Sequence, residues 1–299
     1  MATPINSRWS RLHSQSQKKA KCLVRVHAAG VNPMDWKIRS GVSQNFRPQS
    51  FPYVPGADFA GVIERVGADV TVFDVGQEVF GCVQGTYTQY TLAPVRYITA
   101  KPKLLSFDEA ATIPVGATTA WQGLFDHGNL QQGQRVLILG GSGGVGLVAV
   151  QFARWKGAQV ISTTSTPNSD FVRSLGAETI IDYTQERVED RIHDVDLVLD
   201  TVGGEALATV YPTLKREGTL VTIVGQPDEA KACQFGVHVH RFAAQISSEL
   251  LARFAQLISE GQVKPLVGHT FPLNEAAQAQ ELSQRGHGRG RIVLYVAEQ

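Results

Sequence analysis

The sequence predicts an α/β protein of two domains, in which a region of short β-strands is combined with a doubly wound parallel sheet. Three observations support this prediction. Short runs rich in β-branched residues, separated by turns, fill the first hundred residues, which is typical of a small β-barrel. Strands and helices alternate from Ser106 onward, as in a parallel sheet covered by helices. The chain has 299 residues, 43% of them hydrophobic, which is enough for two cores.

The first region carries the patterns of short strands and turns. Cys22–Ala28 alternates between apolar and polar side chains, and a turn-like Gly30-Val31-Asn32-Pro33 follows it. Further strands are predicted at Gly61–Val66, Glu78–Phe80, Thr86–Leu92 and Tyr97–Ala100.

The second region begins with a predicted helix at Ser106, because Glu109 stands three residues later and completes a capping-box pattern. Strands are then predicted at Arg135–Leu139, Gln159–Thr163, Thr179–Ile181, Val195–Asp200 and Thr219–Val224. Helices are predicted at Val145–Lys156, Ser169–Leu175 and Glu205–Leu214. An amphipathic helix at Ser247–Ser259 and a last strand at Ile292–Val296 complete the chain.

Composition narrows the class of protein. The 28 Lys and Arg residues nearly balance the 27 Asp and Glu residues, so no basic excess indicates a nucleic-acid partner. Three dispersed cysteines predict no disulfide framework and fit a reducing compartment. The longest apolar runs, such as Val145–Val150, are too short to span a bilayer. We therefore expect a cytoplasmic protein, with neither a membrane nor a nucleic acid as partner.

The first twenty residues leave two interpretations open. They are rich in Arg, Lys and Ser, and the first acidic residue of the chain is Asp35. An Arg- and Ser-rich start without acidic residues resembles a mitochondrial transit peptide. The segment has no clear apolar face, however, which favours a solvated tail.

A glycine-rich segment directly follows the predicted strand Arg135–Leu139 and opens a helix. Its G-x-G-x-x-G pattern lies in the context that a dinucleotide site requires. We expect Gly141 to make a tight turn, Gly143 to let a pyrophosphate approach the backbone, and Gly146 to let the helix pack closely on the sheet. The alternative is a glycine-rich turn in a flavodoxin-like sheet without nucleotide. The predicted cofactor contacts of the loop are Gly141, Ser142, Gly143, Gly144, Val145 and Gly146.

The end of the next strand bears on the choice between NADPH and NADH. An NAD site usually carries an acidic residue there, whereas this chain has Thr164 and Ser165. Without a carboxylate at this strand end, a 2′-phosphate is tolerated, so NADPH is favoured and NADH stays possible. Arg173 is the first cation that follows, and it is either a phosphate ligand or a solvated helix residue.

Several ordered segments carry a resemblance to a known family. They include Gly133–Arg154 around the glycine-rich loop, Ala28–Asp35, Pro55–Val62, Asp74–Gly81, Asp200–Gly204 and Gly288–Leu294. Over residues 22–296 the chain resembles the zinc-independent quinone oxidoreductase (zeta-crystallin-like) branch of the medium-chain dehydrogenase/reductase superfamily. The resemblance implies a GroES-like β-barrel domain from residues 1–116 and 238–299, and a Rossmann domain from residues 117–237.

The resemblance also bears on metal chemistry. Zinc enzymes of the superfamily carry a cysteine where this chain has Asn32, and Gly-His-Glu where it has Gly56-Ala57-Asp58. Without those ligands we expect no zinc. The spacing of His238 and His240 suits one face of a strand, which leaves metal binding there as an alternative.

By resemblance, Asn32 and Asp35 lie on the substrate side of the nicotinamide, with Thr119 beside the ring. A simple turn at Asn32-Pro33 and a helix cap at Asp35 are the alternatives. The remaining cofactor contacts that the resemblance implies are Thr201, Val202, Val224 and Gly225 along the cofactor, and Ser165, Asn168 and Tyr183 around the 2′-phosphate.

Three departures from relatives are visible. Relatives place a lysine where this chain has Asn168, so the missing cation would come from Arg289 or Arg291 unless both are solvated charges. No tyrosine follows Arg39-Ser40-Gly41, and Tyr53, the nearest, is interpreted as structural. The β-hairpin that precedes the first strand in relatives has no counterpart in residues 1–20, which would expose part of the β-domain.

The function predicted from these features is an NADPH-dependent oxidoreductase that transfers hydride to quinones or α,β-unsaturated carbonyls. The alternatives are an enoyl reductase of a biosynthetic pathway and a non-catalytic nucleotide-binding protein. The resemblance also implies a homodimer, formed through an edge strand of the Rossmann sheet.

Overall fold

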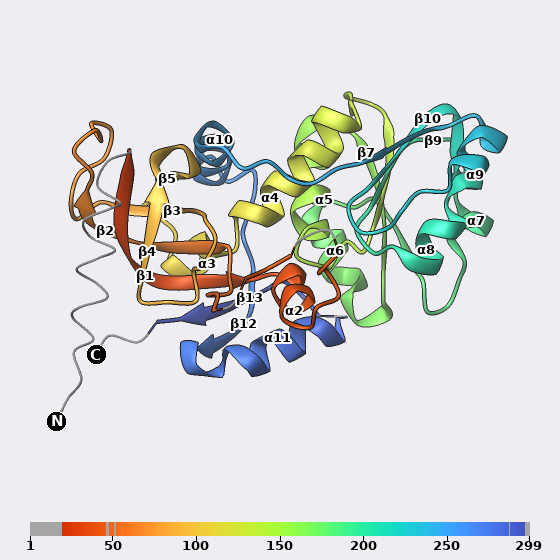
Figure 1. The fold of residues 1–299 in the computed structure, drawn as a ribbon. Coiled ribbons are helices and arrows are strands. Elements are labelled where there is room, and N and C mark those ends of the chain that lie inside the picture. The colour runs from red at the N-terminus through yellow and green to blue at the C-terminus, as the bar shows by residue number, and fades with distance from the viewer. Residues whose placement is uncertain (1–19, 46–47, 51, 287, 297–299) are drawn as a thin grey trace.

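A computed structural model describes residues 20–45, 48–50, 52–286 and 288–296 of the chain. The described residues form two β-sheets with helices between and around them (Figure 1). The seven-stranded sheet lies at the left of the figure and the six-stranded sheet at the right, with α4 (Pro114–Trp121) between them. No helix in the described part of the chain is both long and apolar enough to cross a membrane.

The seven-stranded sheet combines the two ends of the described chain. Its order is β12-β13-β1-β2-β3-β5, and β4 pairs with β1. The last strand, β13, runs antiparallel to β1, with Ile292 opposite Val31. The sheet is therefore built from segments near both ends of the described chain, as expected for a GroES-like domain. The strands are β1 (Lys21–Val31), β2 (Asp58–Val66), β3 (Glu78–Cys82), β4 (Tyr90–Pro94), β5 (Ile98–Ala100), β12 (Val267–Pro272) and β13 (Arg291–Tyr295).

Strand β1 is longer than the sequence predicted, since it continues through the expected turn at Gly30-Val31. Its outer half alternates between half-buried and buried side chains, whereas its inner end is buried on both faces. Gly30 explains this burial, because a Cβ atom there would lie 2.4 Å from the carbonyl oxygen of Ala111, at the end of α3 (Phe107–Ala111). The predicted capping box of α3 is confirmed: the Ser106 hydroxyl accepts a hydrogen bond from the Glu109 N–H at 3.1 Å.

The six-stranded sheet is parallel throughout, in the order β11-β10-β9-β6-β7-β8. This is the doubly wound arrangement of a Rossmann domain, with the reversal of strand order beside β6. Its strands are β6 (Arg135–Leu139), β7 (Gln159–Thr164), β8 (Thr179–Asp182), β9 (Val195–Asp200), β10 (Leu214–Thr222) and β11 (His238–Arg241). The expected boundary after residue 237 does not match the sheet, because β11 pairs with β10 and extends the sheet to Arg241.

The predicted helix Glu205–Leu214 is wrong in its second half. Helix α8 (Gly204–Thr209) is followed by a 3-10 turn at Tyr211–Thr213, and Leu214 already begins β10. Pro212 has no N–H group to continue a helix, which accounts for the early end. The other helices are α2 (Pro33–Arg39), α5 (Gly146–Lys156), α6 (Ser169–Leu175), α7 (Val188–Arg191), α9 (Glu229–Phe235), α10 (Ser248–Ser259) and α11 (Ala276–Arg285).

One hydrophobic core connects the two sheets. Buried side chains of the β-domain, such as Phe80, belong to the same cluster as Val136 and Ile138 of β6. Helices α4 and α10 join the two parts, since α10 contacts both α4 and β5. Trp121 at the end of α4 packs edge-on against Phe152 of α5, with ring centroids 5.4 Å apart. This shared core holds the sheets together and leaves a cleft between them on one side.

Candidate active site

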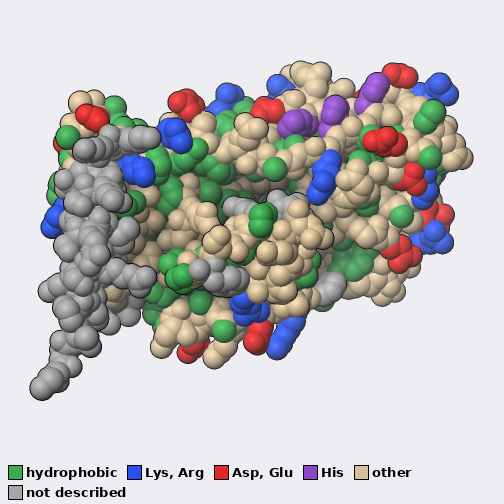
Figure 2. Space-filling view, viewed as in Figure 1, with side chains coloured by type: hydrophobic (Ala, Val, Ile, Leu, Met, Phe, Trp, Pro, Cys, Tyr) green, Lys and Arg blue, Asp and Glu red, His purple; other side chains and the backbone are tan. Residues whose placement is uncertain are grey.

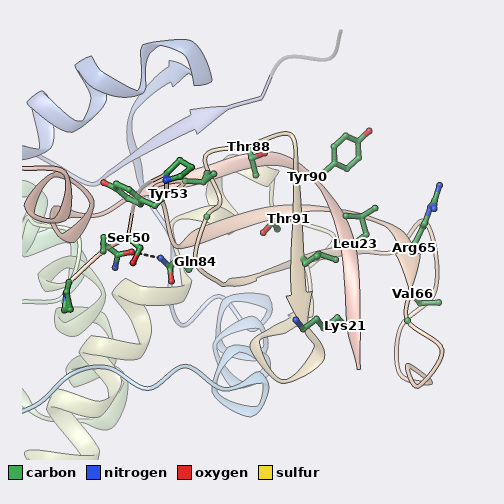
Figure 3. Close-up of a pocket in the computed structure, with 17 residues that line it drawn as sticks. Lys21, Leu23, Ser50, Tyr53, Arg65, Val66, Gln84, Thr88, Tyr90 and Thr91 are labelled. Atoms are coloured by element: carbon green, nitrogen blue, oxygen red, sulfur yellow. Dashed lines mark hydrogen bonds between the residues drawn. The ribbon is translucent and has the colours of Figure 1, made fainter. Parts of the chain in front are cut away.

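A cleft of about 1500 Å³ lies between the two sheets. The glycine-rich loop lines it from the Rossmann side, and Asn32, Asp35 and Thr119 line it from the other. A smaller cavity of about 740 Å³ lies on the β-domain, around Lys21, Arg65 and Tyr90 (Figure 3). The glycine-rich loop does not line the smaller cavity, so the cleft is the candidate active site.

Each glycine of the loop has a distinct role. The tight turn after β6 falls on Gly140, whose φ of +76° suits glycine, and not on Gly141 as expected. Gly141 instead permits close packing, since a Cβ there would lie 2.2 Å from the Ser162 hydroxyl oxygen. A Cβ at Gly146 would lie 2.0 Å from the Gly140 carbonyl oxygen. At Gly143 a Cβ would make only an ordinary van der Waals contact with the Gly140 carbonyl oxygen, at 3.4 Å, and the residue borders the open space of the cleft.

This open space fits a pyrophosphate. The backbone N–H groups of Gly144 and Val145 meet no acceptor among the described residues, and α5 begins directly after them. The N-terminus of an 11-residue helix adds a partial positive charge. Unpaired donors, a missing Cβ and a helix N-terminus together make a cradle for a dinucleotide phosphate.

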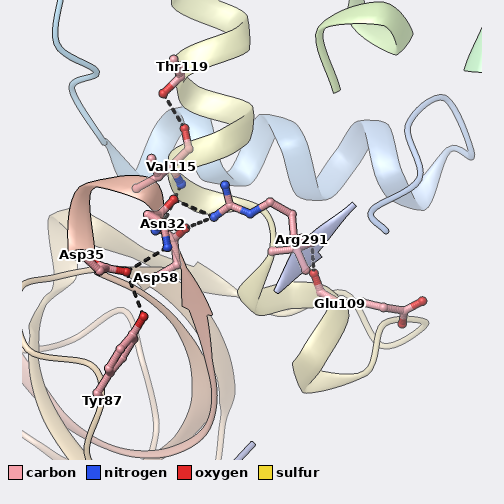
Figure 4. A network of polar contacts seen from close by, with 9 residues as sticks. Asn32, Asp35, Asp58, Tyr87, Glu109, Val115, Thr119 and Arg291 are labelled. Atoms are coloured by element: carbon pink, nitrogen blue, oxygen red, sulfur yellow. Dashed lines mark hydrogen bonds and ion pairs between the residues drawn. The ribbon is translucent and has the colours of Figure 1, made fainter. Parts of the chain in front are cut away.

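A buried polar network forms the opposite wall of the cleft (Figure 4). The guanidinium Nη2 of Arg291 donates to Asp58 Oδ2 at 2.7 Å and to Asn32 Oδ1 at 2.8 Å. The amide Nδ2 of Asn32 donates to the same Asp58 oxygen at 3.0 Å. Asp58 is fully buried, and Asn32 and Arg291 are at most 5% exposed. The network therefore fixes the orientation of the Asn32 amide in the cleft.

Two further contacts extend this network. Asp35 accepts the backbone N–H of Asn32 at 2.8 Å and the hydroxyl of Tyr87 at 2.9 Å, so it caps α2 and anchors the turn. On α4, the Val115 N–H donates to Asp58 at 3.0 Å, and the Thr119 hydroxyl donates to the Val115 carbonyl at 2.7 Å. The three residues that resemblance assigned to the substrate side thus line one wall of the cleft, and the alternative interpretation of Asp35 as a helix cap is confirmed.

Burial shifts the acidity of these groups. Complete burial raises the pKa of the Asp58 carboxyl to about 6, against the opposing effects of Arg291 and the N–H donors of Asn32 and Val115. Burial also raises the pKa of the Tyr87 phenol, and the Asp35 carboxylate raises it further. Tyr87 therefore stays protonated and acts as a hydrogen-bond donor to Asp35. Sequence reasoning missed Tyr87, because 52 residues separate it from its partner.

Tyr53 lines the cleft and was interpreted as structural from the sequence. Burial and the nearby Asp35 carboxylate raise the pKa of its phenol. Its place near Asp35 puts a phenol on the substrate side of the cleft, whereas the segment after Gly41 contains no tyrosine. In the sequence, the feature that could have indicated this role is the position of Tyr53 shortly before Gly56, because this segment lines the cleft.

At the far end of the loop, the predicted 2′-phosphate residues lie beside an unforeseen carboxylate. Asn168 Nδ2 donates to the Ser165 hydroxyl at 3.3 Å, and the Thr164 hydroxyl is buried without a partner in the described structure. The end of β7 carries no carboxylate, as expected. Asp182 ends the neighbouring strand β8, opposite Thr164, and its carboxylate accepts hydrogen bonds from the Thr166 and Thr184 hydroxyls. These bonds lower the pKa of Asp182, so it is ionised. Tyr183 follows it and is 47% exposed.

The ends of β9 and β10 carry the remaining predicted contacts. Thr201 donates its hydroxyl to the Leu139 carbonyl at 2.7 Å, and Val202 and Val224 are 51% and 39% exposed despite being apolar. The Asp200 carboxylate holds the turn by accepting the N–H groups of Val202 and Gly203. Gly225 donates its N–H to the Thr222 hydroxyl at 3.1 Å. Exposed apolar side chains at these strand ends provide a surface on which a flat ring can lie.

The three arginines considered as ligands of the 2′-phosphate lie in different surroundings. Arg291 was predicted to reach the phosphate, but its Nη2 is engaged by Asp58 and Asn32. The aliphatic part of the Arg291 side chain packs against Gly144 of the cofactor loop, because a Cβ at Gly144 would lie 2.6 Å from Arg291 Cδ. Arg173 forms an exposed ion pair with Asp170 at 2.9 Å. Arg289 lines the cleft.

The histidine pair lies outside the cleft wall described above. His238 Nε2 is 3.1 Å from a carboxylate oxygen of Glu217, and the ring of His240 lies 6.2 Å from that of His127. Histidines follow the upper edge of the face in Figure 2. Among the residues that the structure describes, no group of three or more His, Cys, Asp and Glu side chains is arranged to hold a metal ion.

The fold and the cleft define a two-domain oxidoreductase of the dehydrogenase/reductase class. Two family models match: the alcohol dehydrogenase GroES-like domain over residues 18–103, and the zinc-binding dehydrogenase over residues 175–294. The chain belongs to the medium-chain dehydrogenase/reductase superfamily, in its zinc-independent quinone oxidoreductase branch.

Individual relatives agree. The mouse (Mus musculus) NAD(P)H oxidoreductase RTN4IP1, mitochondrial, is 33% identical over 92% of this chain and 81% of its own length. The NADPH-dependent alkenal/one oxidoreductase, chloroplastic, of Arabidopsis thaliana is 32% identical over 93% of this chain and 72% of its own length. The solved quinone oxidoreductase of Coxiella burnetii is 33% identical, covers 93% of this chain and 91% of its own, and superposes with a TM-score of 0.85.

Proposed function

We propose that the protein is an NADPH-dependent oxidoreductase that reduces quinones or α,β-unsaturated carbonyls, with NADH as a possible second donor. The observation that carries the proposal is the cleft itself, in which the phosphate cradle and the Asn32 network face the same volume. The names of the mouse, Arabidopsis and Coxiella relatives support both the cofactor and the substrate class.

The cofactor side of the cleft has defined tasks. The N–H groups of Gly144 and Val145 bind the pyrophosphate, and the open face of Gly143 admits it. Val202 and Val224 offer apolar surface to the cofactor's rings. When bound, the nicotinamide supplies a hydride from its C4 atom.

The substrate side stabilises the charge that hydride transfer creates. A quinone or enone that accepts hydride gathers negative charge on its carbonyl oxygen. The Asn32 amide has two N–H donors, and only one is used by Asp58. Its second N–H is therefore available to that oxygen, while the first holds the amide in place. Protonation then needs only water or a hydroxyl, and we propose Tyr53, which lines the cleft near Asp35, as that hydroxyl.

The test is direct. The purified protein is titrated with NADPH and with NADH, with nicotinamide fluorescence as the readout, and each mixture is then given a panel of quinones and enones. Turnover of at least one compound with NADPH supports the proposal. A folded protein that binds neither dinucleotide contradicts it and favours a non-enzymatic role.

We also propose a homodimer and a cytoplasmic location. Strand β11 is paired on one side only within the described residues, by β10, so its other edge can join a second copy. The lack of an apolar face in the first twenty residues supports the cytoplasm. The mitochondrial name of the mouse relative makes the mitochondrion the competing compartment. Sedimentation tests the dimer, and localisation of residues 1–30 fused to a fluorescent protein tests the compartment.

A further inference from the structure

The adenosine end of the cofactor site is unfavourable for a 2′-phosphate when its own strands are considered alone. Asp182 is ionised there, and Asp170 lies in the first turn of α6. The nearby Asn168 is neutral, and Arg173 is already paired with Asp170. A second phosphate at this end therefore needs a cation from elsewhere in the chain.

Arg289 reaches this end from the other domain. It precedes β13 of the seven-stranded sheet, yet its guanidinium carbon lies 3.8 Å from the ring centroid of Phe171 in α6. The next residue, Gly290, donates its N–H to the carbonyl of Ser142 in the glycine-rich loop at 3.2 Å. The segment thus crosses the cleft and lies over both the loop and the start of α6.

The backbone around Arg289 is closely fixed. Gly290 has a φ of +76°, which suits glycine, and Arg291 donates its N–H to Leu266 at 3.0 Å. On the neighbouring strand β12, a Cβ at Gly268 would lie 2.0 Å from the Arg289 carbonyl oxygen. These contacts set the direction in which the Arg289 side chain leaves the chain.

The charge of Arg289 is uncommitted. Within the described part of the chain its guanidinium has no carboxylate or hydrogen-bond partner, and stacking on Phe171 leaves the edge of its planar fork available. Arg291, two residues later, differs because Asp58 and Asn32 engage it in a buried pair. Arg291 also keeps an unpaired Nε, but that atom is buried against Gly144 of the glycine-rich loop, whereas the guanidinium of Arg289 lies over α6 at the adenosine end.

We propose that Arg289 is the specificity-determining residue for NADPH: its guanidinium binds the 2′-phosphate across the cleft and offsets the charge of Asp182. This inference rests on the proposed function, since it concerns the same cofactor site. A guanidinium matches two phosphate oxygens with two parallel N–H groups, which a 2′-hydroxyl cannot reproduce. Because Arg289 belongs to the seven-stranded sheet's domain, NADPH also ties the two domains together in a way that NADH does not.

The experiment measures binding of 2′,5′-ADP and of 5′-AMP by calorimetry, and of NADPH and NADH by fluorescence, for wild type and Arg289→Gln. We expect Arg289→Gln to weaken 2′,5′-ADP and NADPH by about 10- to 100-fold. Binding of 5′-AMP and NADH should change less than twofold. Arg65→Gln, at an exposed arginine of β2, is the matched control and should leave all four affinities unchanged, and Arg289→Lys should recover part of the loss.

Two results would overturn the inference. An equal loss of NADPH and NADH binding in Arg289→Gln would show a structural role, and unchanged NADPH binding would show that another group holds the phosphate. The proposed function is scored separately, by turnover of quinones and enones. A wild-type protein that prefers 2′,5′-ADP through Arg289 but reduces no quinone or enone contradicts the proposed function alone.

Discussion

Arg291 and Asp58 are 233 residues apart in sequence, yet they form a buried ion pair at 2.7 Å. The pair joins the last described strand to β2 (Figure 4), and the Arg291 side chain packs against Gly144 of the cofactor loop. It also fixes Asn32, which accepts from the same Arg291 nitrogen and donates to the same Asp58 oxygen. One ion pair therefore joins two strands of the β-domain, holds Asn32 in the cleft wall and contacts the cofactor loop of the Rossmann domain.

Arg291→Met should destabilise the protein by about 3–5 kcal/mol, because it leaves the Asp58 carboxyl buried without its cation. Urea unfolding followed by circular dichroism measures the change. Arg173→Met removes an exposed pair and should cost at most about 1 kcal/mol. A similar decrease in unfolding free energy in the two variants would show that the buried ion pair contributes no more to stability than the exposed one.

Asp58 should also make stability depend on pH. Its folded-state pKa, about 6, lies above the ordinary value of 3.8, so its contribution to stability is present at low pH and is lost as pH rises from about 4 to about 6. Asp58→Asn has no such titration. The difference in unfolding free energy between wild type and Asp58→Asn should therefore shrink over this interval. A difference that grows instead would mean that Arg291 holds the pKa below its usual range.

Asn32→Ala should lower kcat by about 10²-fold, since it removes the N–H donor offered to the substrate oxygen. The dissociation constant for NADPH should stay within about threefold of wild type, because the phosphate cradle is on the opposite wall. The folded state is checked by the melting temperature. If kcat is unchanged while the protein remains folded, the substrate oxygen is stabilised elsewhere.

Asp182→Asn should strengthen NADPH binding by about a few-fold and leave NADH binding nearly unchanged, because the repulsion between two solvent-screened negative charges is weak. The pKa of Asp182 is lowered by its hydroxyl partners, so the effect should persist across neutral pH. Asp69→Asn, on the β-domain, is the matched control. Tighter binding of both cofactors would contradict the prediction, because it would place Asp182 near a group common to NADPH and NADH and not near the 2′-phosphate.

Two glycine variants should separate folding from binding. Gly146→Ala puts a Cβ 2.0 Å from the Gly140 oxygen and should lower the melting temperature. Gly143→Ala meets nothing closer than 3.4 Å, so the protein should fold normally and lose most of its dinucleotide affinity. Melting curves and NADPH titrations of both variants test this contrast. Retained affinity in Gly143→Ala would place the pyrophosphate away from this position.

Local patterns in the sequence were sufficient for most elements and for the cofactor loop. Strands β6 and β9 and helix α6 match the predicted ranges fully, because their apolar runs are bounded by residues that end a strand or a helix. The close packing at Gly146 could be predicted in advance, since the spacing of the motif places a glycine there. Ser106 and Glu109 are also a local pair, and their cap was predicted correctly.

Contacts between distant segments could not be foreseen in the same way. Tyr87 meets Asp35 across 52 residues, and no periodicity in either segment indicates it. The extension of the Rossmann sheet to β11 depends on pairing with β10, and the length of β1 depends on its pairing with β2 and β13. The Asp182 carboxylate lies at the adenosine end only because β8 runs beside β7.

By itself, the sequence determined that this is a two-domain α/β protein with a dinucleotide loop, since hydrophobic periodicity and glycine spacing act within a few neighbouring residues. Only the tertiary structure decided which charges meet. It placed Arg291 in a buried pair with Asp58, where desolvation makes a partner necessary. It left Arg289 over Phe171, at the edge of the cleft, with its charge available. Arg289 and Arg291, two positions apart, thus have different roles. Strand β13 turns Arg291 inward, and the preceding loop carries Arg289 across the cleft.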